Sequence, residues 1–277
     1  MKTIKENPMR LFLIPPFVFI LFFMVIPLME VLIRSVFDES GFTLAYFQRF
    51  FATSLYMNVL KNTFTLSLIV SVLSLVLGYP IAYSITKASR KGKIVINTVV
   101  QILYWTSLLV KTYIWIIMLQ QHGVINTILM GLGLIDQPIQ LLHTYFGVVC
   151  GMTYIFLPYM IFSLTPIMQQ IDTNLLTASE NLGASRFYTF RKIFLPLSVP
   201  GIVSGFSIVF LNALGYYIVP ALLGGQSNTM MSQLIQQAIN VELNWNFAAA
   251  ISVVLIIVTI LIMLITQRLG RVKGESK

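Results

Sequence analysis

The sequence predicts an all-α integral membrane protein with six transmembrane helices, and three observations lead to this prediction. First, 57% of the 277 residues are hydrophobic and only 10% are charged, whereas soluble domains carry about 25% charged residues. Second, the chain contains six uncharged runs that are long enough to cross ~30 Å of hydrocarbon as helices. Third, the Lys and Arg residues lie between these runs rather than in one patch. This composition argues against a soluble chain, a disordered chain and a nucleic-acid partner.

The six runs are the predicted spans of a single transmembrane domain covering residues 1–277. They are residues 11–36, 62–86, 94–119, 144–168, 199–223 and 247–267. Each must be helical, because irregular backbone cannot be left unpaired in lipid. The first run is longer than the core of a signal peptide and no small-residue cleavage site follows it, so we expect a retained span.

Helix breakers interrupt several of these spans. A proline removes one backbone donor and kinks a helix, and the freed carbonyl must find another partner. A single proline is tolerated in a membrane helix, but breakers in so many spans favour a bundle that moves over a rigid anchor. They are Pro27, Gly78, Pro80, Pro158, Gly215 and Pro220.

The basic residues predict the orientation of the chain. Three lie before the first span, four in the second connection, three in the fourth and four after the last span. The opposite side has only Arg49 and Lys61, and it carries four of the nine acidic residues. Since loops on the cytoplasmic side are rich in Lys and Arg, both ends of the chain are expected to be cytoplasmic.

The connection at residues 169–198 is too polar to cross a bilayer and too apolar to be a linker. Asp172 or Thr173 can cap a short helix that Gly183 would end. Ser185 can cap a second, amphipathic helix, ended by Pro196, with Phe187, Phe190 and Phe194 on one face. A helix lying flat on the lipid surface is the alternative interpretation of this pattern.

This connection resembles the "EAA" loop in permease subunits of bacterial ABC importers. The loop's pattern is Glu-Ala-Ala, three residues, Gly, nine residues, Ile, one residue and Leu-Pro. The chain follows this spacing but departs at two places, with Thr177 in place of Glu and Ser179 where the family often has Ala. Glu180 lies one turn further on and could substitute in part for the missing Glu. The residues that the resemblance assigns to coupling with an ATPase are Thr177, Ala178, Ser179, Glu180, Gly183, Ile193, Leu195 and Pro196.

Other segments are similar to the spermidine/putrescine-type permeases, and most of all to the first of their two paired subunits. They are residues 77–87, 104–115, 123–126, 215–225 and 244–255. The resemblance implies a type I importer permease in the bacterial inner membrane, with a coupling helix in the loop. It also implies three partners: an ATPase dimer, a second homologous permease and a periplasmic solute-binding protein.

The chain itself is expected to bind no cofactor. It has no G-x-x-x-x-G-K-[ST] segment to cradle ATP phosphates, so ATP and Mg²⁺ would belong to the partner ATPase. We also expect no catalytic or metal site, because the only two histidines, His122 and His143, lie in one external connection and no H-E-x-x-H occurs.

Three charges lie in or near the spans, where charges are costly and are usually paired or functional. Helix rise places Glu30 and Lys111 at a similar depth. We therefore expect either a Glu30–Lys111 pair or a Glu30–Arg34 pair at i,i+4 spacing. Contact with the substrate is the alternative role.

Aromatic side chains accompany Lys111 on one helical face, formed by Tyr104, Leu108, Lys111 and Trp115. Such rings could line a path for a cation through cation–π contacts, or they could serve as an interfacial belt or ordinary packing. The candidate pathway or gate residues are Glu30, Tyr104, Trp105, Lys111, Trp115, Tyr216 and Tyr217.

The predicted function is the permease subunit of an ATP-driven importer, with polyamines as the first substrate class and another small organic solute as the second. An ion-coupled secondary transporter is less favoured, because spans two to six contain no Asp or Glu. An intramembrane enzyme is less favoured still, since Cys150 has no nearby His in the sequence.

Overall fold

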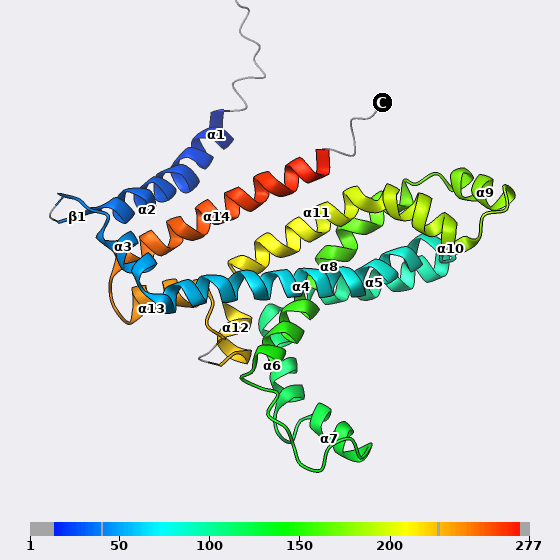
Figure 1. The fold of residues 1–277 in the computed structure, drawn as a ribbon, viewed down its shortest axis with the longest axis horizontal. Coiled ribbons are helices and arrows are strands. Elements are labelled where there is room, and N and C mark those ends of the chain that lie inside the picture. Colours follow the sequence, from blue (N-terminus) through cyan, green and yellow to red (C-terminus); the bar gives the residue numbers. More distant parts are fainter. Residues whose placement is uncertain (1–13, 40, 226–227, 272–277) are drawn as a thin grey trace, which may run out of the picture. The chain divides into compact units, whose positions relative to one another are not determined.

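The chain folds almost entirely as helices, as predicted, in a computed structural model that describes residues 14–39, 41–225 and 228–271 (Figure 1). Two antiparallel strands of two residues each pair Phe37 with Phe42 and Asp38 with Gly41. The elements are α1 Ile14–Ile20, η2 Leu21–Val25, α2 Ile26–Val36, β1 Phe37–Asp38, β2 Gly41–Phe42, α3 Ala45–Ala52, α4 Ser54–Lys87, α5 Arg90–Trp105, α6 Leu108–Leu119, α7 Val124–Gly131, α8 Tyr145–Gln169, α9 Thr173–Asn181, α10 Arg186–Thr189, η3 Phe190–Phe194, α11 Leu195–Leu214, α12 Ile218–Leu223, α13 Met231–Asn240 and α14 Trp245–Arg271.

Six helices in the described residues are long and apolar enough to cross a membrane, which confirms the predicted number. They are Pro15–Val36, Ser54–Lys87, Leu108–Gly131, Tyr145–Gln169, Arg186–Leu214 and Trp245–Leu264. The first has no buried residue in its most apolar window. Its apolar surface is therefore left for lipid or for another subunit to cover.

The third predicted span, residues 94–119, differs from the structure. It is divided into α5 and α6, because Thr106 and Ser107 adopt extended backbone conformations. The Thr106 hydroxyl donates a 2.6 Å hydrogen bond to the Ile102 carbonyl. The Thr106 amide donates to the same carbonyl, so the helical hydrogen bonding of α5 continues up to this residue. The membrane-length helix assigned to this region accordingly starts at Leu108.

The fifth predicted span, residues 199–223, also differs, and its helix starts earlier. The expectation that a loop helix ends at Pro196 is wrong, because the chain stays helical from Arg186 to Leu214. Phe190–Phe194 form a π-helical turn in which the Leu195 amide donates to the Phe190 carbonyl, five residues back. The wider turn lets the helix accept a proline, which has no amide hydrogen to donate. Gly215 ends α11, and α12 follows.

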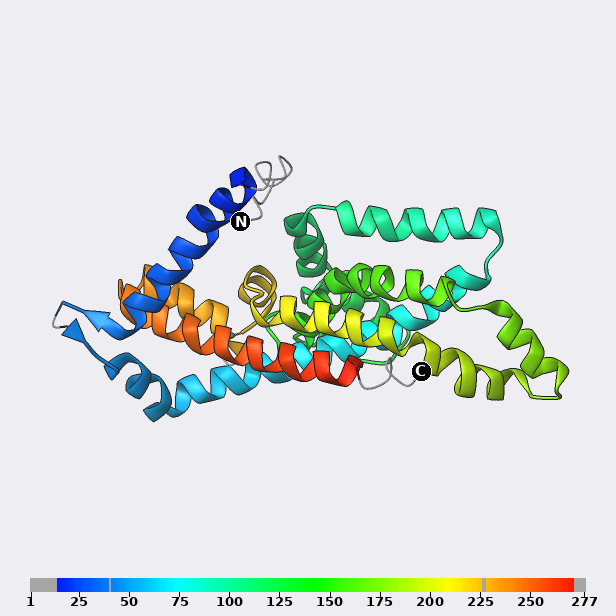
Figure 2. The same cartoon turned by 90° about the horizontal axis from the view of Figure 1, so that it is seen from above.

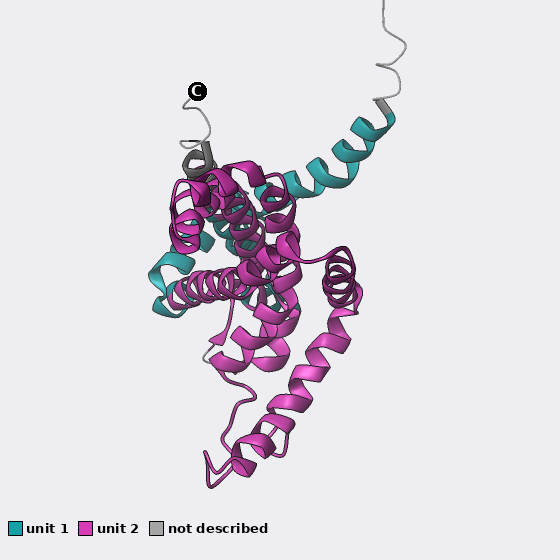
Figure 3. Cartoon of the chain, turned by 90° about the vertical axis from the view of Figure 1, so that its right-hand side faces the viewer, with its two compact units in different colours: residues 1–57, 234–258 teal, residues 58–233, 259–277 magenta. Residues whose placement is uncertain are grey.

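The chain forms two compact units, coloured separately in Figure 3. The first contains residues 1–57 and 234–258. Within it, the Arg49 guanidinium lies 2.9 Å from the Glu242 carboxylate and 4.0 Å from the centre of the Phe247 ring. Burial would lower the pKa of Arg49, but its hydrogen bonds to Glu242 and Tyr56 outweigh this and raise the pKa. These contacts fasten α3 to the start of α14.

The second unit contains residues 58–233 and 259–277, and α8 is its central helix. This helix lies between α5 and α11 (Figure 2) and also contacts α6 and α12. Gly205 allows α11 to come close, since a Cβ atom there would lie 2.6 Å from the Met160 sulfur. Small residues of this kind let membrane helices approach each other closely.

Candidate functional site

The loop between α8 and α11 has the predicted helix, glycine turn and second helix. The Asp172 carboxylate caps α9 by accepting a hydrogen bond of 2.9 Å from the Asn174 amide. The Ser185 hydroxyl caps α10 in the same way by accepting from the Tyr188 amide. These contacts confirm the predicted capping residues. We call residues 169–198 the coupling loop from here on.

Gly183 ends α9 with a positive φ of 86°. The Gly183 amide donates to the Glu180 carbonyl, and the Ala184 amide donates to the Ser179 carbonyl. This pair of bonds is the Schellman motif, which satisfies the last carbonyls of a helix and requires a left-handed residue. A Cβ at Gly183 would meet no atom within 4 Å. The turn therefore selects glycine for its backbone conformation rather than for space.

One side of the coupling loop exposes apolar side chains and an open groove. Leu182 is 89% exposed and Tyr188 is 53% exposed. The groove has a volume of about 660 Å³. It is lined by Leu175, Ala178, Ser179, Leu182, Gly183, Ala184, Ser185, Tyr188 and Ile193. Small residues in the lining leave room for a side chain of another protein to enter.

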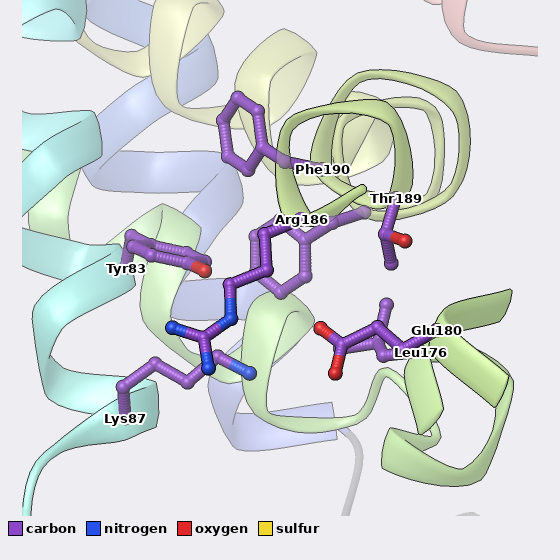
Figure 4. Close-up of a pocket in the computed structure, with 8 residues that line it drawn as sticks. Tyr83, Lys87, Leu176, Glu180, Arg186, Thr189 and Phe190 are labelled. Carbon is purple, nitrogen blue, oxygen red and sulfur yellow. The ribbon is translucent and has the colours of Figure 1, made fainter. Parts of the chain in front are cut away.

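The remaining residues of the loop motif lie apart from this groove. Thr177 is exposed, and its hydroxyl donates to the Thr173 carbonyl of its own helix. Glu180 lines a separate cavity beside Arg186 (Figure 4). Leu195 is half-buried and Pro196 is exposed at the start of α11. The structure therefore gathers Ala178, Ser179, Gly183 and Ile193 at the groove, and not the whole motif.

A contact between two hydroxyl groups joins the two helices of the coupling loop, α9 and α10, which we call its arms. The Ser179 and Thr189 hydroxyl oxygens are 3.0 Å apart. Thr189 is buried, as is Leu176 on α9. In a nearly buried setting, such a hydrogen bond is costly to break, because both groups lose their partner. The arms are thus fastened to each other.

A second set of contacts fastens the loop to α4, and the sequence analysis missed it. The Tyr79 hydroxyl lies 2.9 Å from the Ser198 hydroxyl. The Tyr83 ring stands edge-on to the rings of Phe190 and Phe194, with centroids 5.6 and 4.9 Å away. The spacing of four residues within each aromatic pair was the signal that could have indicated two facing helices. The predicted common face with Phe187 is wrong, because Phe187 is exposed.

Lys111 is buried, and it bonds backbone oxygens of α5. Its ammonium group donates to the Leu103 carbonyl at 2.9 Å, and the Tyr104 carbonyl lies 3.5 Å away. Leu103 and Tyr104 are at the C-terminal end of α5, where the last carbonyls lack helical partners and the helix dipole attracts a cation. Lys111 therefore caps the helix at the break that divides the third predicted span.

Of the two ion pairs that the sequence allowed, Glu30 forms the one with Arg34, four residues further along its own helix. Its carboxylate accepts hydrogen bonds from two nitrogens of Arg34, at 2.8 and 2.9 Å. Both side chains are about half exposed. They line a cavity of about 450 Å³ together with Pro27, Val31 and Trp245. The pair leaves little uncompensated negative charge at Glu30.

The aromatic candidates divide into a connected set and separate rings. The Tyr104 ring contacts the Tyr159 ring at 5.2 Å, and Tyr216 contacts Phe156 at 4.9 Å. Phe156 and Tyr159 of α8 contact each other at 5.8 Å, so the four rings form one row. Trp105 also contacts Tyr104, at 5.4 Å, but is itself 82% exposed. Trp115 contacts Tyr154 instead, and Tyr217 is exposed. Tyr159 and Phe156 were absent from the sequence candidates, because a long apolar run hides which rings face inward.

No metal site is visible in the part of the chain that the structure describes. No group of three His, Cys, Asp or Glu side chains in these residues is placed to hold an ion.

Comparisons with known proteins agree that the chain is similar to membrane components of transport systems. Residues 74–272 match the family model for a binding-protein-dependent transport system inner membrane component. The chain is 30% identical to the spermidine/putrescine transport system permease protein PotB of Haemophilus influenzae, over 100% of this chain and 99% of that protein. It is 36% identical to PotB of Escherichia coli, over 80% of this chain and 81% of that protein.

A solved structure supports the fold. A chain of the bacterial alginate ABC transporter, in complex with an alginate pentasaccharide-bound periplasmic protein, matches with a TM-score of 0.77 and 21% identity. The match covers 96% of this chain and 95% of that chain. The predicted fold of a helical importer permease is confirmed.

The capping role of Lys111 predicts a specific effect on stability. Lys111→Met would leave the Leu103 carbonyl without its charged donor, at a cost of about 1.5–3 kcal/mol. We expect thermal unfolding of the detergent-solubilised protein to shift to lower temperature, and Lys111→Arg to restore most of the loss. Lys61→Met, at an exposed position of α4, is the matched control. An equal shift for the two Met variants would contradict the capping role.

Proposed function

We propose that this chain, which belongs to the family of binding-protein-dependent transport system inner membrane components, is the permease subunit of an ATP-driven importer of spermidine and putrescine. The observation that carries the proposal is a coupling loop with an exposed apolar groove, fastened to a membrane helix by partly buried contacts. The similarity to spermidine/putrescine permeases supports the substrate class. The chain is a multi-pass transport subunit and not an enzyme.

The groove of the coupling loop would receive the ATPase. Leu175, Leu182 and Tyr188 are about half to nine-tenths exposed around it, and such apolar surface is rarely left uncovered in a working protein. Each ATPase of a dimer would contact one coupling loop. ATP and Mg²⁺ would be bound by that partner, so this chain contributes force transmission and not hydrolysis.

Movement of the ATPase would reach the membrane through α4 and α11. Because the Ser179–Thr189 bond joins α9 to α10, and α10 continues into η3, a shift of α9 would carry η3 with it. The contacts of Tyr79 and Tyr83 then pass the displacement to α4. This arrangement fits alternating access, in which helices reorient as a body around a pathway.

The remaining partners would cover surfaces that this chain leaves exposed. The first membrane helix buries none of its most apolar window, and Trp105 is 82% exposed. A second, homologous permease and lipid would cover them. With the basic connections on the cytoplasmic side, both ends of the chain are cytoplasmic and α7 lies on the side where a periplasmic binding protein delivers solute.

The row of rings from Tyr104 to Tyr216 supports passage of an organic cation. Aromatic faces attract ammonium groups, and they do so without the fixed charge that would hold a polyamine too tightly. Glu30 is already paired with Arg34, and Lys111 is held by backbone oxygens, so neither is needed for contact with the solute. Another small organic solute is the second candidate, since the rings themselves do not select for chain length.

Uptake by the reconstituted transporter tests the proposed function. Proteoliposomes would contain this chain, its second permease and the ATPase, with the binding protein outside and ATP inside. We expect radiolabelled spermidine or putrescine to accumulate only when both ATP and the binding protein are present. Accumulation without ATP would contradict an ATP-driven importer, and ATP-dependent uptake of a different solute alone would contradict the polyamine assignment.

The glycine turn predicts a second, more local effect. Gly183→Ala forces a side chain into the left-handed conformation, which costs about 1–2 kcal/mol and would distort the turn between the two arms. We expect several-fold less ATPase to co-purify with the permease, and less uptake. Gly133→Ala is the matched control, because Gly133 has a φ of 67° and also meets no atom within 4 Å, but lies after α7.

The two glycine variants carry a comparable conformational penalty, so only their positions differ. Loss of the ATPase from the Gly133 variant to the same extent would show a general folding defect. Normal ATPase binding by the Gly183 variant would contradict the assignment of this loop to coupling.

A further inference from the structure

Two cavities meet at Lys87, the last residue of α4. The first has a volume of about 400 Å³ and is lined by Tyr83, Lys87, Leu176, Glu180, Arg186, Thr189, Phe190 and Phe194 (Figure 4). The second has a volume of about 490 Å³ and is lined by Thr86, Lys87, Lys93, Met168, Gln169, Ile171, Thr173, Leu176 and Phe194. The cavities share Lys87, Leu176 and Phe194, so an extended ligand could occupy both.

The linings carry more positive than negative charge. Lys87, Lys93 and Arg186 contribute three cations, and Glu180 is the one carboxylate. In the described part of the chain, none of the three cations has a carboxylate within 4 Å. Figure 4 shows the Lys87 ammonium and the Arg186 guanidinium turned toward the same space beside Tyr83. Cations that share a space without a carboxylate partner attract an anion to it.

One part of each cavity's wall is apolar. Phe194 and Leu176 are buried, and the rings of Tyr83 and Phe190 close the wall beside them. The Lys87 ammonium lies 5.9 Å from the Tyr83 ring, which orients the cation at the edge of this wall. A ligand that fits has an anionic group at one end and apolar groups at the other. A free inorganic ion would leave the apolar wall uncovered.

We propose that these cavities bind a membrane phospholipid, with its phosphate held by Lys87 and Arg186 on one side and Lys93 on the other. Lys87 is the last residue of the 34-residue helix α4. At 1.5 Å per residue this helix is longer than the ~30 Å hydrocarbon core, so its charged end lies outside the hydrocarbon, where headgroups are reached. Basic pockets between helices at this surface suit phosphate headgroups. The glycerol and upper acyl atoms lie against Phe190 and Phe194. The lipid thus bridges α4 and the coupling loop.

The proposal rests on the proposed function only in placing the coupling loop at the cytoplasmic surface. The number of bound lipid molecules is measured directly, in an experiment that does not depend on transport. A chain that binds lipid but imports no polyamine would therefore overturn only the substrate assignment. Conversely, polyamine import with no lipid at this site would overturn only the present proposal.

Native mass spectrometry of the transporter, purified with its partner subunits, tests the proposal. Phosphatidylglycerol is added to the delipidated complex and the bound lipid is counted. We expect the double variant Lys87→Gln/Arg186→Gln to retain at least fivefold less lipid than the unchanged complex. The control Arg90→Gln/Lys91→Gln removes two charges from neighbouring exposed positions that line neither cavity, and it should retain the usual amount.

Equal retention by the two double variants would overturn the proposal. Displacement of the lipid by millimolar inorganic phosphate would also overturn it, in favour of a soluble anion. If the double variant does not assemble, acetylation of Lys87 in the unchanged complex gives a second measurement. Phosphatidylglycerol should protect Lys87 from acetic anhydride several-fold, whereas protection by the bound ATPase without lipid would assign the cavities to a protein contact.

Discussion

Two tyrosines on α4 hold the coupling loop against the membrane helices. Tyr79 shares a hydrogen bond with Ser198, and the Tyr83 ring meets Phe190 and Phe194 edge-on. Edge-to-face ring pairs contribute about 0.5–1.5 kcal/mol each beyond the area they bury. Because these contacts lie where η3 becomes α11, they fix the direction in which the loop leaves the membrane. The Lys87 cavities, which are lined by residues of both α4 and the coupling loop, depend on that direction.

The cost of an unpaired backbone group in lipid explains the irregular parts of the helices. At the break after α5, Lys111 supplies a side-chain donor to the Leu103 carbonyl, and the Ile102 carbonyl accepts from both the amide and the hydroxyl of Thr106. Before Pro196, a π-helical turn changes the hydrogen-bond partners instead. A similar turn precedes Pro27, where the Ile26 amide donates to the Leu21 carbonyl. Each irregularity has its own local solution, and a buried charge such as Lys111 has a structural role before it needs a transport role.

The number of membrane helices and the form of the coupling loop could be predicted from the sequence, because both depend on local patterns. Long uncharged runs, the caps at Asp172 and Ser185 and the turn at Gly183 act within a few residues. The break at Thr106 could not be predicted, since an apolar run does not reveal where the backbone leaves the helical conformation. Nor could the Tyr79–Ser198 contact, which joins residues 119 positions apart. Roles in solute passage for Tyr104, Tyr216 and the other pathway residues stay predictions.

The central claim is that the coupling loop and α4 move as one body when the ATPase acts. The most direct measurement is the distance between spin labels at Asn174→Cys on α9 and Ser84→Cys on α4, both exposed positions, in a Cys150→Ala background. Double electron–electron resonance on the assembled transporter should give one narrow distance distribution, with the same mean before and after ATP binds. A mean distance that changes on ATP binding would contradict the claim, because the loop would then move without the helix.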